Sequence, residues 1–242
     1  MEQTSMTARL LSSTSLEERV KLISHGLQEQ CAKWGRDPSK VQMMAVSKTV
    51  PAAIVNHAHQ LGIPLIGENR VQELLSKKDE YGFDRSALEF IGHLQTNKVR
   101  KIVPFVKRIQ SVDSLRLASQ ISRCATELEL TMDCLIEVNI SRESAKTGVL
   151  PEQVEELIHQ VSQLPGLNIT GLMTIGENTD DFTKKEDIFH KMQALFIDIG
   201  AKKIDNVNMQ TLSMGMSGDF LLAVKHGSTL VRLGSALFGA RR

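Results

Sequence analysis

Aromatic residues are scarce in this 242-residue sequence, where they make up 4% of the chain and include one tryptophan and one tyrosine. Proteins that bind single-stranded nucleic acid stack the bases on aromatic side chains, so the scarcity argues against that class. Charge of either sign is not in excess, because 29 basic and 28 acidic residues leave a formal net charge of +1. A nucleic-acid surface normally shows as a basic excess, so we expect no nucleic-acid partner.

Cysteines and long apolar runs are few as well. The three cysteines, Cys31, Cys124 and Cys134, form no close pair with metal-ligand spacing. They predict reduced, buried thiols in a cytoplasmic protein without a metal site. No apolar run approaches the roughly 20 residues that span a bilayer, so we expect no membrane partner. The Ser/Thr-rich residues 1–14 are predicted to be a disordered tail ahead of one domain over residues 15–242.

Short apolar segments alternate with segments of helical periodicity along the chain. Ser15 and Glu18 form a capping-box pattern that starts the first predicted helix, and Gly35 ends it. Residues 177–187 are predicted to form a charged loop that leads into a later helix. The eight predicted strands cover residues 41–47, 64–67, 88–92, 108–112, 134–139, 168–173, 211–213 and 229–233, and the seventh of them is weak.

Eight strands that alternate with helices predict a single α/β domain, a parallel (β/α)8 or TIM barrel. The helix that precedes the first strand is extra to the barrel and is predicted to plug or flank it. An open, doubly wound sheet is the alternative. That fold favours a Gly-x-Gly-x-x-Gly motif after the first strand, and this sequence has none there.

Lys48 ends the first predicted strand and shares one face of it with Met44 and Val46. Function in this class of barrel lies at the carboxyl ends of the strands. A lysine in that place is either a solvated strand end or an amine directed into a site. The pattern alone favours the solvated strand end, because lysines are rarely buried.

The loops after the seventh and eighth strands contain the second candidate feature. These loops are the usual phosphate site of the fold, and here they contain Ser213, Gly234 and Ser235. Ordinary Gly/Ser turn chemistry is an equally good interpretation of this pattern alone. A phosphorylated aldehyde could span a phosphate site and Lys48, because lysine amines form Schiff bases with carbonyls. Pyridoxal phosphate (PLP) and the phosphosugar of an aldolase are both candidates.

Several motifs occur in an order that resembles the pyridoxal phosphate homeostasis protein family. They are AVSKT at 45–49, GENRVQE at 67–73, IGHLQTNK at 91–98, GLM at 171–173, LSMGMSGD at 212–219 and GSTLVRLG at 227–234. The resemblance implies the fold of the N-terminal barrel of alanine racemase, with PLP held on Lys48 as a Schiff base. It implies phosphate contacts from Ser213, Gly234 and Ser235.

The resemblance also implies that Arg232 faces the pyridine nitrogen and that Asn69 and Met173 line the pocket. His93 and Lys146 fall on family motifs, and their roles stay open. Two functions compete. One is a protein of vitamin B6 homeostasis that buffers PLP or delivers it to PLP-dependent apoenzymes, and the other is a PLP-dependent amino-acid racemase.

The residues favour the carrier over the racemase. Racemisation needs an acid or base on each face of the substrate α-carbon, and Lys48 can serve only one. The chain's only tyrosine, Tyr81, is predicted to lie away from the barrel mouth. A cation at the pyridine nitrogen also weakens PLP as an electron sink. We therefore predict a non-catalytic PLP carrier without catalytic residues, which is a monomer or a weak homodimer.

Overall fold

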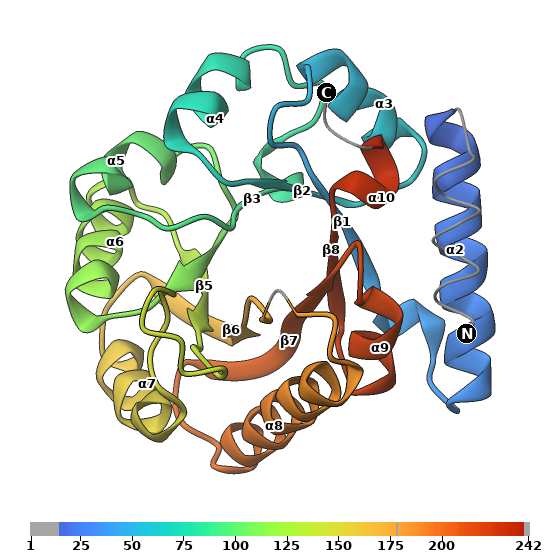
Figure 1. Cartoon of the computed structure of the whole chain (residues 1–242). Coiled ribbons are helices and arrows are strands. Elements are labelled where there is room, and N and C mark those ends of the chain that lie inside the picture. The colour runs from blue at the N-terminus through green and yellow to red at the C-terminus, as the bar shows by residue number, and fades with distance from the viewer. Residues whose placement is uncertain (1–14, 178, 240–242) are drawn as a thin grey trace.

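The computed structural model describes residues 15–177 and 179–239. Within these ranges eight parallel strands pair in chain order, and the last pairs with the first to close a barrel (Figure 1). The strands are β1 Gln42–Val46, β2 Leu65–Glu68, β3 Leu88–Phe90, β4 Arg108–Val112, β5 Met132–Glu137, β6 Leu167–Met173, β7 Val207–Met216 and β8 Leu230–Leu233. The predicted TIM barrel is confirmed, whereas the predicted disordered tail over residues 1–14 lies outside the described residues.

Helices surround the barrel (Figure 1). They are α2 Leu16–Lys33, α3 Ala52–Gln60, α4 Val71–Lys77, α5 Val99–Ile102, α6 Leu115–Glu127, α7 Val154–Ser162, α8 Phe182–Ala201, α9 Phe220–Lys225 and α10 Ser235–Phe238. Helix α2 flanks the barrel beside α9 and α10 and does not plug it. It begins at the predicted cap, where the Ser15 hydroxyl accepts a hydrogen bond from the Glu18 N–H at 3.2 Å. None of the described helices has the length and apolarity needed to cross a bilayer.

Alternation along the strands divides the apolar residues into two sets. Met44, Leu65, Ile91 and Leu230 form a small cluster with Val46. Their neighbours in sequence, such as Ala45 and Ile66, belong to the large core that the helices cover. The small cluster therefore faces the barrel interior, and Lys48, two residues after Val46, continues this inner face at the mouth.

Two predicted boundaries are wrong. Helix α8 begins at Phe182, inside the segment predicted to be a loop, and the Asp181 carboxylate caps it by accepting from the Thr183 and Lys184 N–H groups. Strand β7 has ten residues, Val207–Met216, in place of the weak strand predicted at 211–213. The longer β7 matters for the site, because it carries the chain past Ser213 to the mouth of the barrel.

Candidate functional site

A cavity of about 570 Å³ lies at the carboxyl ends of the strands around β1 and β8. It brings together five of the seven binding residues predicted from the sequence, namely Lys48, Asn69, Arg232, Gly234 and Ser235. The other two, Met173 and Ser213, are fully buried and do not belong to its lining. We refer to this cavity as the Lys48 pocket.

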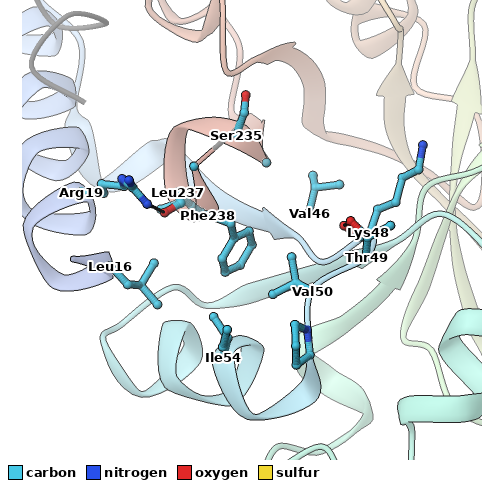
Figure 2. A pocket seen from close by; sticks show the side chains of 13 residues that line it. Leu16, Arg19, Val46, Lys48, Thr49, Val50, Ile54, Ser235, Leu237 and Phe238 are labelled. Atoms are coloured by element: carbon cyan, nitrogen blue, oxygen red, sulfur yellow. Dashed lines mark hydrogen bonds between the residues drawn. The ribbon is translucent and has the colours of Figure 1, made fainter. Parts of the chain in front are cut away.

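Lys48 also borders a second cavity of about 550 Å³, which Figure 2 shows. Its walls are mainly apolar and include Val50, Ile54 and Phe238. The Lys48 side chain extends away from Val50 and Ile54 in this view (Figure 2). No hydrogen bond or ion pair engages its amine in the described part of the chain. The amine is therefore available to a ligand in the Lys48 pocket.

The turn that follows β1 is held from the outer side of the barrel. Thr49 has a φ of 64°, a left-handed conformation that is uncommon for a β-branched residue. Its N–H donates a hydrogen bond to the Glu73 carboxylate. The Lys77 amine donates to the carbonyl groups of Ser47, at 3.0 Å, and Val50, at 3.3 Å. These contacts fix the backbone before and after the predicted lysine.

Tyr81 lies on this outer side of the sheet. Its hydroxyl donates to the fully buried carboxylate of Glu68, which also accepts from the Ser47 hydroxyl at 2.7 Å. Burial raises the pKa of Tyr81 above its usual value, and the negative charge of Glu68 raises it further. Tyr81 is not part of the Lys48 pocket, in agreement with the predicted position away from the mouth.

Arg232 is a buried cation in the wall of the pocket, with 4% of its surface exposed. Its Nη1 donates to the Ser213 hydroxyl at 2.6 Å, and its Nη2 donates to the Thr174 carbonyl at 2.7 Å. Burial lowers the pKa of Arg232 to about 10, although the carboxylates of Asp219 and Glu137 oppose this shift. The guanidinium therefore stays charged at neutral pH, and two neutral oxygens hold it in place.

Ser213 lies beneath the pocket. Its hydroxyl accepts the hydrogen bond from Arg232 and donates one to Gln110 Oε1 at 2.7 Å. A hydroxyl has a single proton, so Ser213 has none to offer a phosphate. The position predicted for a phosphate ligand is thus used in the structure to orient Arg232.

Ser217 reaches the pocket lining in its place. Its Oγ accepts hydrogen bonds from the backbone N–H groups of Gly234 and Ala236, both at 3.1 Å. At the adjacent Gly218, an added Cβ would meet no atom within 4 Å, so the chain leaves open space there. These two N–H groups fix the Ser217 oxygen, and its hydroxyl proton has no acceptor in the described part of the chain, so it is the proton of Ser217 that could be donated to a phosphate oxygen.

Asn69 and Met173 differ in their access to the pocket. Asn69 lines it, and its Oδ1 is buried without a hydrogen-bond partner in the described part of the chain. A buried acceptor of this kind is costly unless a ligand or water pairs with it. Met173 is fully buried at the end of β6, where it pairs in register with Glu137 and Ser213. It supports the neighbouring strands and does not reach the lining.

The two motif residues without a predicted role lie outside the lining. His93 has an exposed side chain, and its Nδ1 lies 4.0 Å from Asp113 Oδ2. It does not cap the turn that follows, which begins at Gln95 without a side-chain cap. Lys146 donates to the Glu143 carboxylate and, at 3.1 Å, to the Gly176 carbonyl.

The three cysteines were predicted to be reduced, buried thiols. All three cysteines are buried and free, and burial raises the pKa of the Cys134 thiol above its usual value. Across residues 15–177 and 179–239, no group of three or more His, Cys, Asp or Glu side chains could hold a metal ion.

A strand-end lysine and a buried arginine in one cavity define a ligand-binding TIM barrel. A family model described as "Alanine racemase, N-terminal domain" matches residues 23–242. Curated relatives called pyridoxal phosphate homeostasis protein include that of Pseudomonas aeruginosa, 37% identical over 228 residues, which are 94% of this chain and 96% of the relative. The Aquifex aeolicus protein of the same name is 36% identical over 225 residues, 93% of this chain and 98% of the relative. The chain therefore belongs to the alanine racemase N-terminal domain family and, within it, to the pyridoxal phosphate homeostasis proteins.

A solved structure supports the same assignment. PipY from Synechococcus elongatus, in a structure with PLP bound, aligns with a TM-score of 0.78 and 31% identity over 93% of this chain and 100% of that chain. The family and the alanine racemase-like fold that the motifs implied are thus confirmed.

Sequence reasoning missed several residues of the site. Ser217 lies in the loop predicted after the seventh strand, but Ser213, at the predicted strand end, was chosen as the phosphate ligand in its place. Thr174 contributes its backbone carbonyl, and the residue type at a position does not predict a backbone contact of this kind. Gln110 is a polar residue two positions after Arg108 in a predicted strand, and this alternation is a usable signal for a polar barrel interior.

Proposed function

We propose that this protein binds PLP in the Lys48 pocket as a Schiff base on Lys48 and acts in vitamin B6 homeostasis. The observation that carries the proposal is that one cavity contains an amine without a protein partner in the described part of the chain, a buried arginine and the hydroxyls of Ser217 and Ser235. The names of the relatives and the PLP-bound structure of PipY support it.

The residues present fit the three reactive parts of PLP. The hydroxyls of Ser217 and Ser235 line one end of the pocket and would donate to the phosphate, while the N–H groups of Gly234 and Ala236 hold the Ser217 oxygen in place. Arg232 would face the pyridine nitrogen, and Asn69 has a buried acceptor without a partner. The Lys48 amine would form the Schiff base with the aldehyde group of PLP, with loss of one water molecule.

We further propose a carrier in place of a racemase. When PLP is bound, its ring supplies an electron sink, and a cationic Arg232 at the ring nitrogen disfavours the protonated ring that makes this sink strong. Tyr81 donates to Glu68 on the outer side of the sheet and is remote from the pocket lining. The pocket thus holds the cofactor without an evident second base.

Delivery to PLP-dependent apoenzymes and action in the cytoplasm belong to the same proposal. A Schiff base is reversible, so a holder that releases PLP to a tighter-binding acceptor needs no additional chemistry. Three free, buried cysteines agree with a reducing compartment.

Reduction with borohydride tests the assignment of Lys48. PLP added to the purified protein should give a visible absorption band, and borohydride should fix one pyridoxyl group on the peptide that contains Lys48. The variant Lys48→Ala should lose both signals, whereas Lys107→Ala, at an exposed lysine outside the pocket, should keep them.

Turnover of L-alanine to D-alanine tests the choice between carrier and racemase. The proposal predicts no racemisation above the rate of free PLP. Rapid racemisation by the wild type that disappears in Lys48→Ala would overturn the carrier assignment, and a wild type without any absorption band would overturn PLP binding itself.

A further inference from the structure

A chain of polar side chains runs through the barrel interior below Arg232. All of its members are buried, and they come from strands on different sides of the barrel: Glu89, Arg108, Gln110, Ser213 and Arg232. Arg108 holds Glu89 through two hydrogen bonds, at 2.7 Å and 3.0 Å. The chain then continues from Glu89 to Gln110 at 2.6 Å, to Ser213 at 2.7 Å and to Arg232 at 2.6 Å.

From Arg232 through Ser213 and Gln110, each residue donates to the next until the chain ends at the Glu89 carboxylate, which also accepts from Arg108 on its other side. The Glu89 carboxylate can only accept, so the amide nitrogen of Gln110 must face it. This orientation points Gln110 Oε1 at Ser213, which uses its single proton to donate to it. The lone pairs of Ser213 are then left for Arg232. A charge deep in the barrel therefore determines the orientation of a hydroxyl at the floor of the pocket.

This series of hydrogen-bonded side chains determines which N–H groups of Arg232 are available to a ligand. Nη1 donates one hydrogen bond to the Ser213 hydroxyl, and Nη2 donates one to the Thr174 carbonyl. The acceptors in both bonds are uncharged, and the carboxylates that act on Arg232 electrostatically, Asp219 and Glu137, do not hydrogen-bond to it. The guanidinium thus keeps an excess of positive charge and a fixed plane at the pocket wall.

We propose that Gln110 and Glu89 are positioning residues, which fix the guanidinium of Arg232 toward the ring nitrogen of the bound cofactor. The inference rests on the proposed function, since PLP is the ligand whose ring nitrogen Arg232 would meet. Neither residue touches the pocket, so both act through Ser213. The residue at position 110 would then affect the absorption spectrum and the affinity of the bound cofactor without touching it.

The variant Gln110→Glu tests the direction of the chain with almost no change in shape. When protonated, the new carboxyl donates to Glu89 and accepts from Ser213, as glutamine does. When ionised, it faces the Glu89 carboxylate and cannot donate. The charged groups around it are Glu89, Arg108 and Arg232, all of which the wild type shares.

The proposal predicts that Gln110→Glu matches the wild type at low pH and departs from it as the pH rises. The departure should appear as a shifted absorption maximum of bound PLP and an affinity about tenfold weaker, as expected for one lost charge-assisted contact. Gln110→Leu should show the shifted maximum at every pH. A spectrum, affinity and pH profile identical to the wild type in both variants would overturn the proposal.

Ser122→Ala is the matched control. Ser122 is also buried and donates one hydrogen bond at 2.6 Å, to the Pro165 carbonyl on the helix side of the sheet, away from Arg232. This variant should lose stability without any spectral shift. A shift of the same size in Ser122→Ala would mean that general loosening causes the effect, and it would overturn the positioning role.

A readout without PLP separates this inference from the proposed function. In the ligand-free protein, the guanidinium N–H signals of Arg232, identified by their loss in Arg232→Lys, should exchange faster with solvent in Gln110→Leu than in the wild type. Unchanged exchange would overturn the positioning role even if PLP binds. If the wild type shows no PLP band but N–H exchange is still faster in Gln110→Leu, only the proposed function is overturned.

Discussion

Substitution of Ser217 can distinguish binding of the phosphate from binding of the pyridine ring. The Ser217 hydroxyl, held by the N–H groups of Gly234 and Ala236, is a contact that we assign to the phosphate alone. We expect Ser217→Ala to weaken PLP binding about tenfold, in the range of one hydrogen bond to a charged group. Pyridoxal, which lacks the phosphate, should bind both proteins equally in a spectrophotometric titration. Equal weakening of both ligands would mean that Ser217 acts through pocket shape.

Glu137 is a carboxylate with 3% exposure at the end of β5, where the Thr147 hydroxyl donates to it at 2.7 Å. Burial raises the pKa of Glu137, and this outweighs the opposite effects of Thr147 and Arg232. A carboxyl group whose pKa is higher in the folded than in the unfolded state binds its proton more tightly when folded. Its contribution to stability therefore falls as the pH rises through these two values.

Glu137→Gln should accordingly raise Tm at pH 8 and lose this advantage near pH 4, where both states of the wild type are protonated. In a chain of this size, about 1 kcal/mol corresponds to roughly 2–4 °C in Tm. Calorimetry across this pH range measures the difference, with the exposed Glu156→Gln as a control that should show none. A difference in Tm that does not vary with pH would contradict the titration argument.

The identity of the site could be predicted from the sequence at some residues and not at others. Lys48, Asn69, Gly234 and Ser235 follow strand ends, Arg232 lies near the end of β8, and these five residues do meet in one cavity. The prediction for Ser213 depended on where β7 ends. Because a strand rises about 3.3 Å per residue, the three additional residues of β7 were enough to leave Ser213 below the pocket.

Helix α4 and the turn after β1 behave as one element. Lys77 ties them together through the Ser47 and Val50 carbonyls, and its amine lies 2.6 Å from Glu68. Lys77→Met would leave Glu68 as an uncompensated charge with no exposed surface. We expect a loss of about 3–5 kcal/mol in the free energy of unfolding, the usual cost of breaking a buried ion pair.

Denaturant unfolding measures this loss. The exposed pair of Lys191 and Asp187 offers a control, because Lys191→Met should cost less than about 1 kcal/mol. The double variant Lys77→Met/Glu68→Gln should recover part of the stability by removing the isolated charge. If Lys77→Met destabilises the protein no more than Lys191→Met does, the ion pair of Lys77 and Glu68 does not stabilise the turn after β1.

Element boundaries were predictable where burial imposes a period, and not elsewhere. The first two turns of α8 are solvent-exposed, so their polar residues carry no apolar stripe, and only the Asp181 cap marks the start. The first half of β7 likewise alternates between exposed and half-buried positions. In contrast, β4 is buried along its whole length and was predicted with both ends correct.

At the scale of the whole molecule, the barrel interior is polar on one side and apolar on the other. Glu89, Arg108 and Gln110 lie on β3 and β4, whereas Met44 and Leu230 belong to the apolar cluster beside β1 and β8. The closed sheet has no free edge to offer to another chain. Association of two copies would therefore need an apolar surface on the helices.

The exposed apolar residues do not supply one obvious surface of that kind. The large hydrophobic side chains that are exposed in the described part of the chain are Ile54, Leu115, Leu128, Ile175, Phe182, Ile197 and Met216. Ile175 and Met216 line the Lys48 pocket, and the others are divided among α3, α6 and α8. Stable dimers usually bury well over 1,000 Å² with an apolar centre, by a rough standard.

We therefore predict a monomer at micromolar concentration in sedimentation velocity, with and without PLP. Ile197 on α8 has 61% of its surface exposed and is the strongest candidate for a contact between copies. Ile197→Lys should leave the sedimentation coefficient unchanged if the chain is monomeric. A wild-type dimer that Ile197→Lys dissociates would instead place an interface on α8, and a dimer that persists in this variant would place it on another face.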